Sequence, residues 1–177
     1  LTFIDKRFAQ AHVGNTLVGV YITGVGKQAV KRSQDYLSKH VQAKTVWNVG
    51  NVGALGDYPS GLILRIGRVM GQNGASVKDI DPQSPFTLVT VNSLQNKSKL
   101  VSQYPQADVV DMEAFHWLAF YPDCRVIKVV LDRKDDQLHA PVRGVIWSWR
   151  IRRNARRLCR LLEYFLRQIR GFLLRQK

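Results

Sequence analysis

Several residue types and patterns are scarce or missing in this sequence, and each shortage excludes a class of protein. Two cysteines occur in 177 residues, Cys124 and Cys159. Their spacing fits neither a zinc site nor a C-x-x-C motif, and one pair cannot staple a chain of this size. There is no run of eighteen apolar residues and no signal-peptide pattern. We therefore predict a cytoplasmic protein without a membrane-spanning helix or a disulfide framework.

Acidic residues are also few, and the resulting charge is unevenly placed. The chain carries 27 Lys or Arg against 13 Asp or Glu, a formal net charge of +14. Eleven of these bases and a single acid, Glu163, lie in residues 143–177. The basicity therefore belongs to the C-terminal segment, which argues against a protein coated with nucleic acid over its whole surface.

The remaining composition is that of one globular domain, with 45% hydrophobic and 23% charged residues. Runs enriched in β-branched residues predict strands at residues 17–23, 45–48, 62–69, 86–91, 108–111 and 125–132. Helical spacing predicts helices at residues 27–41, 94–103 and 113–120. Strands that alternate with helices predict a three-layer α/β domain with a mixed, largely parallel central sheet.

The spacing of apolar and basic residues at 144–177 predicts a basic amphipathic helix. We expect it to belong to the same domain as the core at residues 1–143. Its apolar residues recur every three or four positions, from Trp147 through Phe165 to Phe172. The opposite face carries Arg150, Arg152, Arg153, Arg156, Arg157 and Arg160. Such a face is usually only solvated, but it also fits contact with an anionic membrane, RNA or an acidic partner.

The most informative segment is residues 107–116, which read A-D-V-V-D-M-E-A-F-H. An apolar strand here runs into an acidic corner and then a helix, and open α/β sheets bind ligands where strands end. Glu113 is therefore a candidate site residue. The structural alternative is that Asp111 caps the helix and Glu113 faces the positive end of its dipole.

This segment resembles the M-E segment of the purine nucleoside phosphorylase superfamily, and especially of its 5'-methylthioadenosine/S-adenosylhomocysteine nucleosidases. Other stretches resemble the superfamily in the same order: I-T-G-V-G-K at 22–27, V-W-N-V-G-N-V-G-A-L at 46–55, Y-P-Q-A-D-V-V at 104–110 and V-V-L-D-R-K-D-D-Q-L-H at 129–139. Nothing before Leu17 resembles the superfamily's first strand, which we expect to be missing. The resemblance implies a nucleoside phosphorylase-like fold, a homo-oligomer and no metal or organic cofactor.

The resemblance also implies a general acid at Asp132. Protonating the purine ring lets the base leave as a neutral molecule, and a positioned acid contributes ~10² to 10⁴-fold to such a step. Asp132 follows the apolar run V-I-K-V-V-L and matches the superfamily's acid by position, although Leu131 replaces the usual Ser before it. The structural alternative is a solvated loop carboxylate.

Further residues would bind the substrate if the resemblance holds. Glu113 would accept hydrogen bonds from the ribose, Met112 would pack on the sugar or base, and Phe86 is a stand-in for the aromatic residue that stacks on the purine. A sugar-side loop would contain Asn48, Gly50, Asn51 and Gly53. Phosphorylases of the superfamily carry a phosphate-binding Arg at the place of Asn48, so water is the expected nucleophile.

The sequence thus predicts hydrolysis, or at least binding, of a purine nucleoside. The alternative is a catalytically inactive member of the superfamily that acts as an interaction protein through the basic C-terminal helix.

Overall fold

The computed structural model describes residues 2–3, 8–13, 16–74, 76–93 and 96–134. The predicted helix at residues 144–177 lies outside the described residues. The same holds for its arginines and for the contact with an anionic partner that was predicted for them. Within the described ranges, no helix is both long and apolar enough to cross a membrane.

A small antiparallel sheet precedes the first long helix. Its elements, in chain order, are β1 (Thr2–Phe3), β2 (Phe8–Val13) and β3 (Thr16–Tyr21), followed by α1 (Lys27–His40). The rings of Phe8, Tyr21 and Tyr36 pack with centroids 5.4–6.5 Å apart and hold this sheet against α1. Strand β2 was not predicted, because it alternates small apolar and polar side chains and lacks β-branched enrichment.

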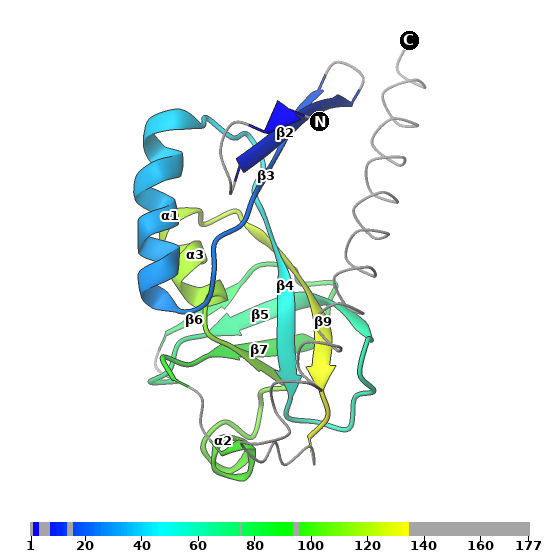
Figure 1. The fold of residues 1–177 in the computed structure, drawn as a ribbon. Coiled ribbons are helices and arrows are strands. Elements are labelled where there is room, and N and C mark those ends of the chain that lie inside the picture. Colours follow the sequence, from blue (N-terminus) through cyan, green and yellow to red (C-terminus); the bar gives the residue numbers. More distant parts are fainter. Residues whose placement is uncertain (1, 4–7, 14–15, 75, 94–95, 135–177) are drawn as a thin grey trace, which may run out of the picture.

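A larger mixed sheet forms the centre of the protein (Figure 1). Its strands are β4 (Trp47–Ala54), β5 (Ile63–Met70), β6 (Val77–Asp79), β7 (Phe86–Thr90), β8 (Val109–Asp111) and β9 (Arg125–Asp132). They lie in the order β6-β5-β7-β8-β4-β9, and a further pairing of β5 with β9 closes the sheet on itself. The predicted mixed sheet is confirmed. Parallel pairings do not predominate, since β4–β8, β5–β6 and β5–β9 are antiparallel.

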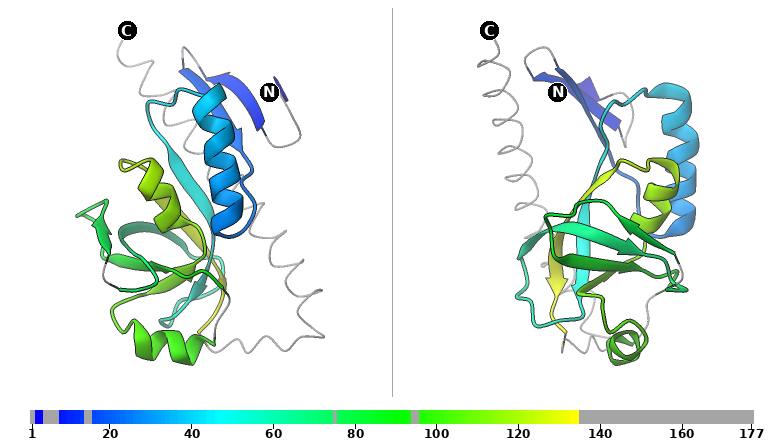
Figure 2. Two further views of the ribbon diagram at one scale, coloured as in Figure 1. Left: turned by 90° about the vertical axis from the view of Figure 1, so that its left-hand side faces the viewer. Right: turned by 180° about the vertical axis from the view of Figure 1, so that it is seen from behind.

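Helices α2 (Lys97–Gln103) and α3 (Ala114–Phe120) pack on opposite faces of this sheet. One apolar core joins Leu118 of α3 to Leu88 and Val109, and the other joins Leu100 of α2 to Val89. Successive side chains of a strand point to opposite faces, so β7 and β8 contribute to both cores. Helix α1 contacts α3, and the two lie side by side in all views (Figure 2). The three-layer prediction is confirmed.

The strands that contain Asn48, Asp111 and Asp132 are neighbours in the sheet, but their ends do not all lie at one rim. The strand predicted to end at Asn48 continues to Ala54, because the glycine-rich segment is extended strand rather than a loop. Strand β8 is antiparallel to β4, whereas β9 is parallel to it. Asp111 and Asp132 therefore end strands that run in opposite directions.

Candidate active site

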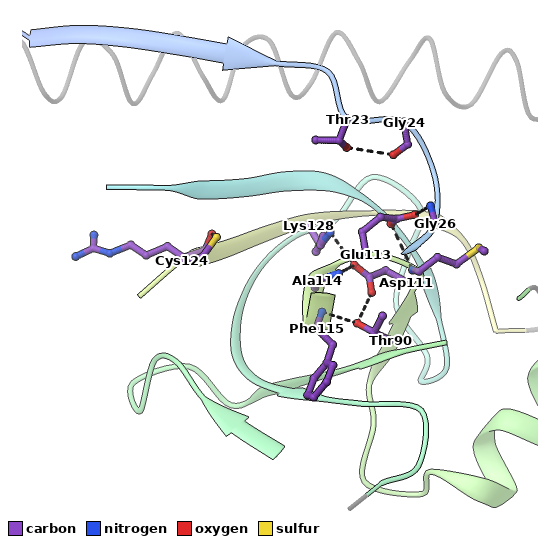
Figure 3. A network of polar contacts seen from close by, with 12 residues as sticks. Thr23, Gly24, Gly26, Thr90, Asp111, Glu113, Ala114, Phe115, Cys124 and Lys128 are labelled. Atoms are coloured by element: carbon purple, nitrogen blue, oxygen red, sulfur yellow. Dashed lines mark hydrogen bonds and ion pairs between the residues drawn. The ribbon is translucent and has the colours of Figure 1, made fainter. Parts of the chain in front are cut away.

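Two turns that are far apart in sequence meet at Glu113 (Figure 3). The backbone N–H of Gly26, at the start of α1, donates a hydrogen bond of 2.7 Å to Glu113 Oε1. Gly26 has a φ of 84°, which glycine adopts without strain, and a Cβ there would lie 3.6 Å from Met112 Cε. Met112 and Glu113 are thus held at the N-terminal end of α1.

Burial is the main influence on the ionisation of Glu113. It raises the pKa of this carboxyl group, and the negative charge of Asp111 raises it further. The hydrogen bond from Gly26 and the positive charge of Lys128 act in the opposite direction. Glu113 is consequently a carboxylate whose charge depends on its immediate neighbours.

Asp132 lies at the end of β9 and is buried, with 6% of its surface exposed. Its carboxylate forms an ion pair with Lys97, the first residue of α2. Asp132 Oδ1 also lies 3.3 Å from the position that a Cβ on Gly53 would take, and Lys97 Cε lies 3.5 Å from it. The structure therefore brings together Asp132, Gly53 and Lys97.

Val110 lies between this group and the Met112–Glu113 corner. Its Cγ1 is 3.3 Å from the same Cβ position on Gly53, and both Val110 and Met112 pack against the core that α2 covers. Gly53 pairs with Asp132 on one side and with Val110 on the other, so the last two backbones are roughly 10 Å apart. Met112 and Asp132 consequently share one face of the sheet.

Other residues of the predicted site are not brought together with Asp132. Because side chains alternate along β4, Asn48 and Gly50 face away from Gly53, and Gly50 instead lies beside Lys128 Nζ, 3.5 Å from its Cβ position. Asn51 shares the face of Gly53. The predicted sugar-side loop is therefore corrected to a strand, of whose four predicted residues only Asn51 and Gly53 lie on the face that carries Asp132.

Phe86 is also separated from the corner. It begins β7, whereas Thr90 at the other end of that strand pairs with Asp111, which puts Phe86 roughly 13 Å away along the strand. Its ring packs edge-on against Tyr58, at 5.9 Å between centroids, beside the core. In this structure it is a packing residue.

A buried polar network that was not predicted from the sequence lies beneath Glu113. Lys128 Nζ lies 2.8 Å from Asp111 Oδ2, and the hydroxyl of Thr90 donates a hydrogen bond of 2.7 Å to Asp111 Oδ1. Both side chains of the ion pair are at most 2% exposed. One signal points to Lys128 but not to its partner, namely a lysine in the middle of the apolar run V-I-K-V-V-L.

A shallow cavity of about 160 Å³ lies beside the first turn of α3. Its lining includes Lys27, Gln72, Asn73, Thr90, Phe115 and His116. Among the described residues that line it, neither Glu113 nor Asp132 occurs. The volume is below the roughly 300 Å³ of small ligand sites, so this cavity alone would not hold a nucleoside. The described residues contain no group of three His, Cys, Asp or Glu that could hold a metal ion.

Comparisons with known proteins define the class of fold. No protein-family model matches the sequence, and no curated protein matches it. The chain is similar to solved nucleosidases. Among these is a mutant of the Helicobacter pylori nucleosidase MTAN with 5'-methylthioadenosine in its active site (TM-score 0.72, 14% identity, covering 91% of this chain and 84% of that one).

Two further solved structures agree with this likeness. The futalosine hydrolase of Helicobacter pylori gives a TM-score of 0.71 at 15% identity, over 91% of this chain and 84% of the other. The S-adenosylhomocysteine nucleosidase of Streptococcus pyogenes, in complex with 5-methylthiotubericidin, gives a TM-score of 0.70 at 16% identity. The match covers 90% of this chain and 82% of the other. The chain therefore has the nucleosidase fold that its sequence motifs imply.

Proposed function

We propose that this protein hydrolyses the N-glycosidic bond of a purine nucleoside, with water rather than phosphate as the nucleophile. One observation carries the proposal. Met112 and Asp132 share one face of the sheet, on either side of Val110, with Glu113 beside Met112. This arrangement occurs in a fold whose solved relatives include a nucleosidase with 5'-methylthioadenosine in its active site.

In this proposal Glu113 binds the sugar. A carboxylate accepts hydrogen bonds from neighbouring hydroxyl groups, and such charge-assisted bonds are about twice as strong as neutral ones. The thioether of Met112, next to Gly26, supplies an apolar surface for the sugar or base.

Asp132 passes a proton to the purine ring as the base departs. The ammonium group of Lys97 contacts this carboxylate and can supply a proton to it. The proton then moves from Lys97 through Asp132 to the base, and the base leaves as a neutral molecule.

Water is the nucleophile because the motif at residues 46–55 lacks a cation for phosphate. Asn48 occupies the place where phosphorylases carry Arg, and it lies on the face of β4 that points away from Gly53. An amide cannot balance the charge of a phosphate ion.

The test is to measure purine release from adenosine and from 5'-methylthioadenosine, each with and without phosphate. We expect a free purine and a free sugar at a rate that phosphate does not change. Ribose 1-phosphate that forms only with phosphate would show that the nucleophile is wrong. Binding without purine release would limit the site to nucleoside binding, and neither binding nor release would refute the proposal.

A further inference from the structure

Lys128 is the largest fully buried side chain in the described part of the chain, and it is charged. It occupies the middle of β9, between apolar neighbours that are also buried. Taking an ammonium group out of water is unfavourable unless it is paired, and a buried ion pair is often no more stable than apolar residues of the same volume. Stability alone therefore does not explain why a lysine occupies this position.

The partner of Lys128, Asp111, helps to fix the backbone that follows Glu113 (Figure 3). Asp111 Oδ2 accepts a hydrogen bond of 3.0 Å from the backbone N–H of Ala114 and also contacts Lys128 Nζ at 2.8 Å. Thr90, which donates to Asp111, accepts a hydrogen bond of 3.0 Å from the N–H of Phe115. The first turn of α3, which follows Glu113 directly, is thus attached to Asp111 and Thr90.

The same arrangement creates an electrostatic conflict that Lys128 relieves. Asp111 is buried and Glu113 is partly buried, and two carboxylates that lie close together in such a place favour protonation of one of them. The charged groups that act on Glu113 are Asp111 on β8 and Lys128 on β9, while Lys27 on α1 and Asp111 act on the nearby His116 of α3. Of the two lysines, only Lys128 forms an ion pair with Asp111 in the described residues.

We propose that Lys128 is a positioning residue for Glu113. By neutralising Asp111, it fixes the first turn of α3 and allows Glu113 to remain the ionised acceptor that the sugar hydroxyls need. This purpose rests on the proposed function, whereas the charge relation between the three side chains does not.

The charge relation can be measured without a substrate, because the chain contains only two glutamates, Glu113 and Glu163. Labelling the glutamate carboxyl carbons with ¹³C gives two NMR signals, and Glu113→Gln identifies the one that belongs to the site. The pKa of Glu113 is then read from a pH titration of wild type, Lys128→Met, Lys128→Arg and Asp111→Asn.

The two neutralising variants should act in opposite directions. In Lys128→Met the positive charge that lowers the pKa of Glu113 is gone, while Asp111 keeps its hydrogen bonds from Thr90 and Ala114, so the pKa of Glu113 rises. In Asp111→Asn the pKa of Glu113 falls, because the nearby negative charge is gone. Lys128→Arg keeps the positive charge, so Glu113 should titrate in this variant as it does in wild type. A role in folding alone would destabilise both variants without these opposite shifts.

Nucleoside affinity, measured by calorimetry with 5'-methylthioadenosine, is the second readout. Lys128→Met should lose binding at a pH at which wild type still binds, and the double variant Asp111→Asn/Lys128→Met should recover it. The proposal is overturned if the Glu113 titration is unchanged in both single variants, or moves the same way in both. Failure of the double variant to recover binding would likewise show that Lys128 does not act through Asp111.

If Lys128→Met does not fold, Asp111→Asn decides the matter alone, and a Glu113 pKa at or above the wild-type value contradicts the proposal. If wild type shows the expected titration but binds no nucleoside, the proposed function fails while the charge relation stands.

Discussion

The ammonium group of Lys97 contacts the carboxylate of Asp132 and also donates a hydrogen bond to the carbonyl of Arg133. The first residue of α2 is thereby attached to the end of β9. The two side chains are 18% and 9% exposed, so this pair is neither a surface ion pair nor a fully buried one. It supports the position of the residue on which the proposed chemistry depends.

Replacing Lys97 with Met should therefore lower the free energy of unfolding. We expect a loss of about 1–3 kcal/mol, between the values typical of exposed and of buried ion pairs. The measurement is urea denaturation, and the matched control is Lys99→Met on the exposed side of the same helix, which should change stability by less than about 0.5 kcal/mol. Equal effects of the two substitutions would show that the contact with Asp132 contributes nothing.

Glu113→Gln should not lower stability at pH 7, although it should abolish nucleoside binding. Burial and Asp111 raise the pKa of Glu113 in the folded protein, so folding favours its protonated form. The protonated group contributes fully to the free energy of unfolding below its pKa in the unfolded protein, and this contribution is lost as the pH rises through its pKa in the folded protein. Ionised Glu113 is therefore unfavourable at neutral pH. The glutamine stays neutral, and its carbonyl can still accept from Gly26.

Urea denaturation at pH 7 and at about pH 4 tests whether ionised Glu113 lowers stability, because the wild-type carboxyl group gains its proton as the pH falls. The variant should equal or exceed wild type at pH 7, and the difference should shrink at the lower pH. A clear loss of stability at pH 7 would make Glu113 a structural residue.

Gly53→Ala should reduce purine release more than Gly50→Ala does. A methyl group on Gly53 would lie 3.3 Å from both Asp132 Oδ1 and Val110 Cγ1, so the proposed acid would have to shift. On Gly50, the nearest atom is Lys128 Nζ at an ordinary contact distance of 3.5 Å. Steady-state rates of the two variants, both checked for folding by circular dichroism, make the comparison. Equal rates would argue that the position of Asp132 is unimportant.

Tyr58→Phe should destabilise the protein by about 1 kcal/mol, the usual net value of one hydrogen bond. The Tyr58 hydroxyl donates a bond of 2.6 Å to Asp108 Oδ1, and this bond, with smaller effects of burial and of the Asp108 charge, raises the pKa of Tyr58 to about 12. Because the pKa of Tyr58 is higher in the folded than in the unfolded protein, the tyrosine stabilises the fold at any pH below its unfolded pKa. This stabilisation is lost as the pH rises through about 12.

The difference between Tyr58→Phe and wild type in urea should therefore be constant at neutral pH and shrink in strong alkali. The packing against Phe86 is retained in the variant, since the ring is unchanged. A difference that does not depend on pH would contradict this account of the hydrogen bond.

The predicted strands and helices agree with the structure wherever hydrophobic periodicity is strong. Strand β9 ends at the predicted Asp132, and β7 begins at the predicted Phe86, because apolar runs of this kind are buried on both faces. Strand β4 was predicted too short, since glycine favours loops on average. In this sheet it allows Asp132 and Lys97 to approach the backbone at Gly53.

The arrangement of the site was harder to predict than its residues. Sequence motifs predict Met112, Glu113 and Asp132 as site residues. The face to which Asn48 and Gly50 point depends on the length of β4. The antiparallel pairing of β4 with β8 leaves no local signal in the sequence. Lys128 was missed because a single lysine in an apolar run gives no indication of its partner, which lies 17 residues earlier at Asp111.

The most direct test of the nucleosidase proposal is the rate of purine release from 5'-methylthioadenosine by Asp132→Asn. The matched control is Asp123→Asn, an exposed aspartate that lies just before β9. We expect wild type and the control to release purine at similar rates, and Asp132→Asn to be slower by ~10²-fold or more, as for loss of a general acid. A folded Asp132→Asn that releases purine at the wild-type rate would contradict the account.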